Sequence, residues 1–121
     1  MANPVVHFEV LGKNADALQS FYKDIFNWQI QPAVPGYAMA LPGTGINGGI
    51  GGDQGGGAGR VTFYVEVKDI DSTLRSIEKK GGKTVQQPMD VPNGPRIALF
   101  SDPEGHVIGL IKAGSGTAAR A

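Results

Sequence analysis

The sequence predicts an α+β fold in which two strand–helix–strand–strand–strand (βαβββ) modules form curved mixed sheets that enclose a cleft. Three observations support this prediction. Apolar residues alternate along 6–10 and again along 61–67, which is the period of a strand. An amphipathic helical pattern follows each of these segments. Ten of the 19 glycines fall between Gly43 and Gly59, where the first pattern ends and the second begins.

The first half opens with a strand over 4–11. Asn14 is a suitable N-cap for the helix that follows, and Asn27 ends that helix. Between them, apolar residues recur with helical spacing from 18 to 26, which predicts one buried helix face. Three shorter strands are expected after the helix, at 28–30, 37–41 and, more weakly, 45–50.

The second half repeats this order. A strand over 61–67 precedes a helix that Asp69 or Asp71 caps and that Gly81-Gly82 closes. The remaining strands are expected at 83–85, 96–100 and 106–111, the last one after a turn at 102–105. Without a gap, Val6 aligns with Val61 and Asp16 with Asp71, so the internal repeat has a period of about 55 residues.

The repeat defines the expected domain. Each half has a sheet with one face under its own helix, and the partner sheet is the natural cover for the other face. We therefore predict one domain over 1–115, made of modules at about 4–52 and 60–113. A flexible glycine-rich linker is expected at 51–59 and a flexible tail at 114–121.

Composition excludes several classes of function. The 11 basic and 11 acidic residues give a net charge of zero, which argues against nucleic acid as a partner. The absence of cysteine removes disulfides, thiolate metal sites and cysteine nucleophiles. With 2 histidines, one chain cannot supply three imidazoles to a metal. No secretion signal or spanning apolar run is evident, so we expect a cytoplasmic protein with no membrane partner.

The strand period also assigns faces. Residues 6, 8 and 10 of the first strand, and 63, 65 and 67 of the repeat, should pack under the helices. For Glu9 and Glu66 taken alone, solvent exposure is the favoured interpretation. For His7 a structural role is favoured over a metal or ligand contact. The faces away from the helices carry Val5, His7 and Glu9 in the first strand and Thr62, Tyr64 and Glu66 in the repeat.

Three local motifs, in this order and spacing, resemble the glyoxalase/bleomycin resistance/extradiol dioxygenase group, which is the vicinal oxygen chelate superfamily. The resemblance covers about residues 4–113 and implies two βαβββ modules, usually in a homodimer. The motifs are Phe21-Tyr22-Lys23-Asp24 leading to Phe26 and Trp28, Val67-Lys68-Asp69-Ile70-Asp71, and Asp102-Pro103-Glu104-Gly105 before an apolar strand.

The resemblance also implies one divalent metal held by His and Glu side chains from four strands. His7 matches the first ligand position. The other three positions fall at or beside Gly49, at Thr62 and at Gly109, none of which is a matching ligand. One imidazole does not hold a catalytic metal at useful affinity, so we predict no metal and no other cofactor. A metal site would need Glu9 or Glu66 to turn inward.

The leading functional hypothesis is a metal-independent protein that binds a small hydrophobic or aromatic molecule, as the bleomycin-resistance branch does. On this hypothesis it is not an enzyme, and Gly49 and Gly109 enlarge the floor of the cleft. A metal-dependent glyoxalase-like lyase or isomerase, or a dioxygenase, is one alternative, and a non-catalytic interaction module is another. A homodimer is expected, with its modules side by side or swapped. The candidate ligand-binding residues are His7, Glu9, Asn47, Thr62, Tyr64 and Arg96.

Overall fold

The computed structural model describes residues 2–53 and 57–116. It contains two βαβββ modules, so the α+β fold expected from the repeat is confirmed. The first module has β1 (Val5–Gly12), α1 (Ala15–Phe26), β2 (Gln29–Val34), β3 (Tyr37–Leu41) and β4 (Gly48–Gly52). The second has β5 (Arg60–Val67), α2 (Ile70–Lys79), β6 (Lys83–Asp90), β7 (Arg96–Ser101) and β8 (Val107–Lys112).

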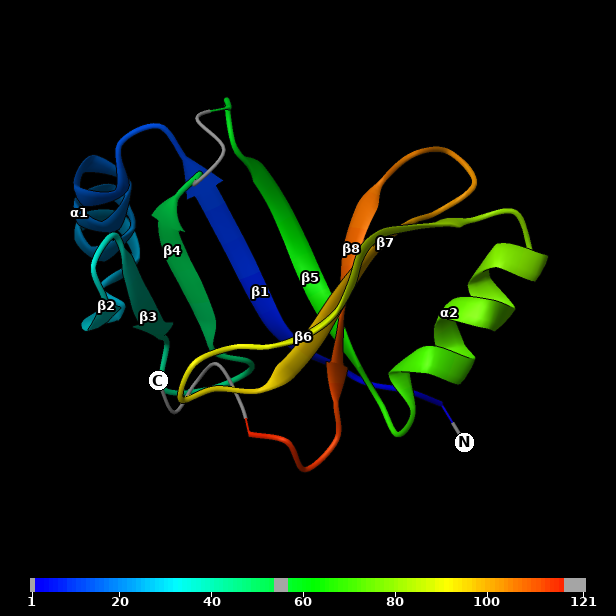
Figure 1. Ribbon diagram of the computed structural model, residues 1–121. Coiled ribbons are helices and arrows are strands. Elements are labelled where there is room, and N and C mark those ends of the chain that lie inside the picture. The colour runs from blue at the N-terminus through cyan, green and yellow to red at the C-terminus, as the bar shows by residue number, and fades with distance from the viewer. Residues whose placement is uncertain (1, 54–56, 117–121) are drawn as a thin grey trace.

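All eight strands belong to one mixed sheet with the order β2-β3-β4-β1-β5-β8-β7-β6. The modules join where β1 pairs antiparallel with β5, with Phe8 opposite Phe63 and His7 opposite Tyr64. The parallel partner of each central strand lies outside it, β4 beside β1 and β8 beside β5. Figure 1 shows α1 and α2 at opposite ends of this sheet, with β6 and β7 crossing in front of β8 because the sheet is curved.

Both helices begin at the capping residues that the sequence indicates. The side chain of Asn14 accepts a hydrogen bond from the backbone N–H of Ala17, which supplies a partner to a free donor of the first turn. Asn27 ends α1 in the left-handed region, at φ 59°, and its N–H donates to the Lys23 carbonyl. Of the two candidate caps for α2, the structure has Asp69, which accepts from the N–H of Ser72.

The two helices are buried to different extents. From α2, Ile70 and Leu74 are buried against sheet residues that include Val67, Ala98 and Leu110. No residue of α1 is buried, although its apolar pattern predicts a buried face. That expectation is wrong at three positions, because α1 packs mainly on β4 and less on β1 and β2, and these side chains lie outside that contact. The exposed fractions there are 55% for Phe21, 60% for Ile25 and 55% for Phe26.

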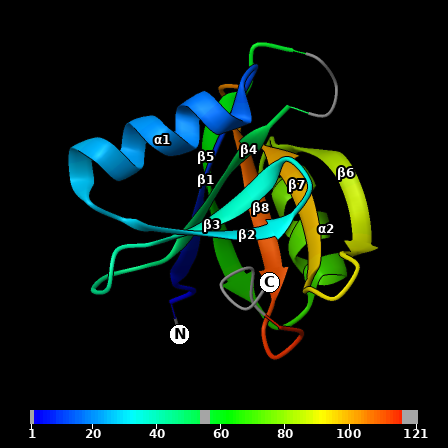
Figure 2. The same cartoon turned by 90° about the vertical axis from the view of Figure 1, so that its left-hand side faces the viewer.

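On the helix-facing side of the central strands, Val65 and Val67 pack with Ile70 and Leu74 of α2 as expected, but two other positions differ from the expectation. Because α2 lies mainly over β6 and β7, Phe63 of β5 is 40% exposed instead of packed under a helix. A bulge in β1 between Val5 and His7 changes the alternation, and Val6 packs against the cluster of Tyr64, Leu99 and Ile111. The 90° view in Figure 2 shows the sheet curving between the two helices.

The link between the modules begins later than the sequence indicates, because Gly51 and Gly52 belong to β4. Asp53 then anchors the chain, since its N–H donates to the Gly12 carbonyl and its side chain accepts from the N–H of Gly59. Of the remaining linker, residues 54–56 lie outside the described residues, while Gly57 and Ala58 are exposed.

After β8, the chain turns back onto the second module. The hydroxyl of Ser115 donates to the Lys112 carbonyl and accepts from the N–H of Arg96. Residues 117–121 of the expected tail lie outside the described part. Within the described ranges, no helix has the length and apolar character that crossing a bilayer requires.

Candidate functional site

A cavity of about 380 Å³ lies between the two modules. Its floor is formed by side chains of the central strands β1 and β5. One wall comes from the end of β2 and the start of β3, and the other comes from the loop between β6 and β7. The curvature of the sheet brings these two distant edges over the central strands. The lining residues are His7, Glu9, Ala33, Val34, Tyr37, Tyr64, Val91, Pro92, Asn93, Gly94, Pro95, Ile97 and Ile111.

A hydrogen-bonded network around Glu9 is the polar part of the lining. The hydroxyl of Tyr37 donates to Glu9 Oε2 at 3.0 Å, and the hydroxyl of Tyr64 donates to Oε1 at 3.2 Å. Glu9 comes from β1, Tyr37 from β3 and Tyr64 from β5, so both modules contribute to it. Glu9 is 9% exposed, which corrects the expectation of a solvated side chain. Its buried carboxylate is tolerated because each oxygen has a hydroxyl partner.

His7 extends the network on the other side of Tyr37. Its Nε2 lies 3.1 Å from the Tyr37 hydroxyl oxygen, and its ring meets Tyr64 edge-on with a centroid distance of 5.4 Å. The single hydroxyl hydrogen of Tyr37 goes to Glu9, so the Tyr37 oxygen accepts from His7. This arrangement assigns the imidazole hydrogen to Nε2.

Burial controls the ionisation of these groups. Desolvation lowers the pKa of His7 from 6.5 to about 4, so the imidazole is neutral near pH 7. Desolvation also raises the pKa of Glu9, while the two tyrosine hydrogen bonds and the charge of Arg60 oppose that rise. The pKa values of Tyr37 and Tyr64 are raised, first by burial and then by the Glu9 charge, so both phenols stay protonated.

Two glycines make room for the tyrosine rings. A Cβ atom at Gly49 of β4 would overlap the Tyr37 phenol, and one at Gly109 of β8 would overlap the Tyr64 ring. From the sequence, these glycines are expected to enlarge the cleft floor. That expectation is wrong, because the aromatic rings fill the space that the missing side chains leave.

The six candidate ligand-binding residues fall into two groups. His7, Glu9 and Tyr64 lie together in the cavity lining, whereas Asn47, Thr62 and Arg96 do not line it. The Thr62 hydroxyl donates to the Val107 carbonyl at 2.6 Å, which joins β5 to the start of β8. Arg96 of β7 pairs with Asp90 at 3.1 Å. Asn47, just before β4, accepts a backbone hydrogen bond from Phe8.

Sequence reasoning missed Tyr37 and the 91–95 loop as parts of the site. Tyr37 stands at the start of a correctly expected strand, but its place in the site depends on how β3 pairs with β4. The sequence signal for the position of Tyr37 is the pair of glycines at 49 and 51. A Cβ atom at either glycine would collide with Tyr37. For the loop, the signal is Pro92-Asn93-Gly94-Pro95, a turn-forming sequence in which Asn93 has φ 57°.

These residues do not fit a divalent metal of the expected kind. Across 2–53 and 57–116, no cluster of three or more His, Cys, Asp or Glu side chains is placed to hold an ion. Glu9 is the acidic side chain beside His7, and both its oxygens already accept tyrosine hydrogens. A carboxylate at Gly49 or Gly109 would have to displace a tyrosine ring.

The fold and cavity define a protein with two βαβββ modules and a site between them, formed within one chain. The chain belongs to the Glyoxalase/Bleomycin resistance protein/Dioxygenase superfamily, which it matches over residues 5–110. This match and the fold confirm the resemblance seen in the sequence motifs.

Two curated relatives match parts of the chain. A probable lactoylglutathione lyase of Synechocystis sp. is 41% identical over 64 residues, which are 52% of this chain and 47% of that protein. The anthracycline biosynthesis protein DauV of Streptomyces sp. is 35% identical over 66 residues, 54% of this chain and 24% of that protein. The chain therefore matches less than half the length of either relative.

Solved structures agree in fold at low sequence identity. A methylmalonyl-CoA epimerase, solved with methylmalonyl-CoA, superposes with a TM-score of 0.66 at 15% identity, covering 97% of this chain and 99% of that one. A superfamily member from Vibrio splendidus also gives a TM-score of 0.66, at 16% identity, over 92% of this chain and 99% of that chain. These similarities show the shared fold.

Proposed function

We propose that this protein binds a small hydrophobic or aromatic molecule in the cavity between its modules, without a metal. The walls are largely apolar and include Val34, Val91 and Pro95, while Ile97 and Ile111 continue the apolar surface from β7 and β8. The hydrogen-bonding groups are concentrated around Glu9. An apolar chamber with a few placed polar groups is the usual design of a small-molecule site.

One observation carries the metal-independent part of the proposal. Tyr37 and Tyr64 occupy the space above Gly49 and Gly109, where the family's metal-binding carboxylates would project. Their hydroxyls engage the Glu9 carboxylate instead. A metal ion would have to break this network, and His7 is the one residue that matches a ligand position of the family. Organic ligands need no such rearrangement.

The partial relatives bear on the kind of ligand. One is named for anthracycline biosynthesis, and anthracyclines are flat fused-ring aromatic compounds. A flat ring system can pack against the aliphatic and proline side chains that form the cavity walls. The other is named as a probable lactoylglutathione lyase, which keeps a glyoxalase-like enzyme as the competing hypothesis.

The test uses the neutral fluorescent probe N-phenyl-1-naphthylamine on protein treated with a chelator. We expect saturable one-to-one binding with enhanced probe emission. Val34→Trp places a large ring at the cavity wall, where the native side chain is 57% exposed, and should weaken binding at least about tenfold.

The matched control is Val85→Trp. Val85 is 52% exposed on β6 and lies outside the cavity lining, so this variant should bind the probe as the wild type does. Absence of saturable binding, or equal weakening by both tryptophan variants, would contradict the proposal.

A further inference from the structure

We infer that the cavity selects ligands that present a hydrogen-bond donor to Glu9, above all a protonated amine carried on an apolar ring system. This inference deepens the proposed function and rests on it. The reason is that the hydrogen-bond donors of the polar floor are already used within the protein, whereas its acceptors are only partly used.

The donors of the floor are used within the protein. Tyr37 and Tyr64 each have one hydroxyl hydrogen, and both hydrogens go to Glu9. The assigned Nε2 hydrogen of His7 goes to the Tyr37 oxygen. None of these three side chains retains a hydrogen for a ligand unless the network breaks. The remaining side-chain donor of the lining is the amide of Asn93, an exposed loop residue.

The acceptors of the floor are only partly used. Each carboxylate oxygen of Glu9 has two acceptor positions, and one tyrosine hydroxyl occupies one of them. The Tyr64 oxygen donates its hydrogen and keeps its lone pairs. A ligand N–H or O–H therefore finds acceptors in place, whereas a ligand carboxylate or carbonyl finds none of the floor's hydrogens free.

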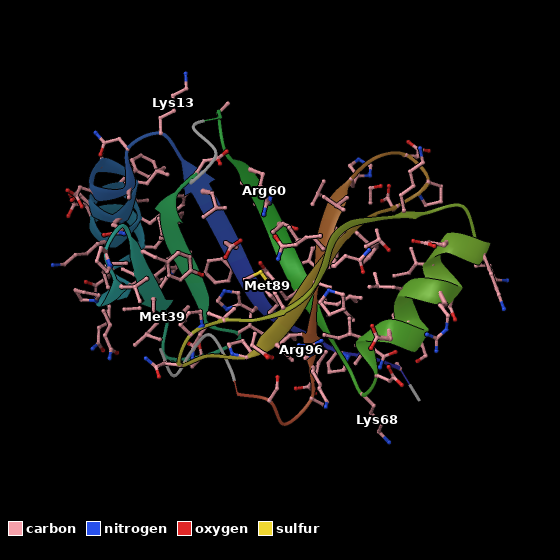
Figure 3. The ribbon with its side chains drawn as sticks, in the orientation of Figure 1. Lys13, Met39, Arg60, Lys68, Met89 and Arg96 are labelled. Carbon is pink, nitrogen blue, oxygen red and sulfur yellow. The ribbon has the colours of Figure 1, made fainter. Side chains whose placement is uncertain are left out.

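Charge favours the same ligands. Among the described residues, no ion pair involves Glu9. Arg60, near the start of β5 in Figure 3, acts on the Glu9 charge but does not line the cavity. Its Nε is buried without a hydrogen-bond partner, so this atom is not bound to Glu9. Arg96 lies well apart from Arg60 in the same view and pairs with Asp90.

A buried carboxylate without an ion-pair partner gains more from a ligand cation than an exposed one would, because water screens it less. His7 does not supply this charge, since its imidazole is held neutral by burial. The ligand's own ammonium group would be the direct counter-ion of Glu9. The aliphatic walls of the cavity would then bury the ring system of the ligand.

Four probes that share a naphthalene ring test the inference by calorimetry at pH 7 with a chelator present. They are 2-naphthylmethylamine, 2-naphthalenemethanol, 2-methylnaphthalene and 2-naphthoate. We expect the amine to bind at least about tenfold more tightly than 2-methylnaphthalene, the alcohol to lie between them, and 2-naphthoate to bind most weakly.

Glu9→Gln keeps the shape of the side chain and removes its charge. This variant should abolish most of the amine's advantage and leave the affinity for 2-methylnaphthalene within about twofold. Glu66→Gln is the control, because Glu66 is a half-buried glutamate of β5 outside the lining, and it should preserve the wild-type ranking.

A second variant covers the case in which Glu9→Gln does not fold. Tyr64→Phe removes one of the two hydroxyls that compete for Glu9, and with it a hydrogen bond that lowers the Glu9 pKa. Compared with the wild type at pH 8, where a raised Glu9 pKa matters less, the amine's advantage should be kept or increased. Loss of that advantage in folded Tyr64→Phe would overturn the inference.

The outcomes separate the inference from the function on which it rests. Equal affinities across the series would overturn the inference and leave an apolar binding site. Tightest binding of 2-naphthoate would also overturn it and would indicate that Arg60 dominates. No binding of any probe would contradict the proposed function itself.

Discussion

The phenol of Tyr37 lies over Gly49, so close that a Cβ atom at position 49 would overlap its hydroxyl group. From there the hydroxyl reaches Glu9 Oε2 at 3.0 Å. The glycine on β4 and the tyrosine on β3 thus form one structural unit that holds a buried carboxylate. A side chain at position 49 and the ring of Tyr37 exclude each other.

The first prediction tests that exclusion. Gly49→Ala should reduce the free energy of unfolding by about 1–3 kcal/mol, because overpacking forces the ring or the backbone to move. In a Tyr37→Ala background, the same substitution should cost much less. Chemical denaturation of the four proteins in this cycle gives the coupling energy.

Gly52→Ala is the matched control on the same strand. A Cβ there meets its nearest atoms at 3.9 Å and 4.0 Å, which is ordinary contact. An equal cost of Gly49→Ala with and without Tyr37 would contradict the account of why position 49 is glycine.

The second prediction concerns His7 and acid stability. Its folded-state pKa of about 4 lies below the ordinary histidine pKa of 6.5, so the unfolded chain binds the proton more tightly between these values. His7 protonation should therefore remove stability as the pH falls through this window. The expected loss between pH 7 and pH 5 is about 2 kcal/mol.

His7→Gln should lack that loss, whereas His106→Gln should retain it, because His106 is the exposed histidine. Urea unfolding at several pH values measures both variants against the wild type. Equal acid sensitivity of His7→Gln and the wild type would show that the imidazole is not held neutral.

The third prediction concerns Glu9, whose titration should change stability with pH in the opposite direction to that of His7. Burial raises its folded-state pKa, so the folded protein binds this proton more tightly than the unfolded chain. The stability that Glu9 contributes is then full below the unfolded pKa and is lost as the pH rises through the raised value. Glu9→Gln, which has no such titration, should become more stable relative to the wild type between pH 4 and pH 7.

The measurement is again urea unfolding across that range, and subtraction of the wild-type curve removes the His7 contribution common to both. A relative stability that falls with rising pH would mean that the tyrosine hydrogen bonds and Arg60 outweigh desolvation. That result would revise the electrostatic account while leaving the geometry intact.

The fourth prediction concerns assembly. The homodimer expected from the sequence stays a prediction, and the exposed apolar side chains of α1 are the reason to test it. Sedimentation equilibrium should give the mass of two chains. A double substitution, Phe21→Arg with Ile25→Arg, should give a monomer if α1 takes part in the interface. A monomeric wild type at about 0.1 mM would contradict the prediction.

Much of the fold could be predicted because its signals are local and repeated. The alternation around His7 and around Tyr64 places both residues on the face away from the helices, together with Glu9. The repeat then predicts that the two modules face one cleft. These inferences need only the strand period and the order of elements.

The rest depends on pairings that no local pattern encodes. Tyr37 enters the site because β3 pairs with β4, whose glycines admit its ring. The 91–95 loop enters because the sheet curves until its far edge approaches β1. The sequence predicts Glu9 in solvent because charged strand residues are usually exposed, whereas its burial depends on two hydroxyls distant in sequence.

The most direct test of the central claim is divalent-metal binding to the chelator-stripped protein. Calorimetry with Zn²⁺, Ni²⁺, Mn²⁺ and, without oxygen, Fe²⁺ should give no binding above background, for the wild type and for His7→Ala alike. Tight binding of one metal ion per chain in the wild type, lost in His7→Ala, would contradict the claim that the Tyr37–Glu9–Tyr64 network has taken the place of the metal site. That result would instead support the alternative hypothesis of a metal-dependent enzyme.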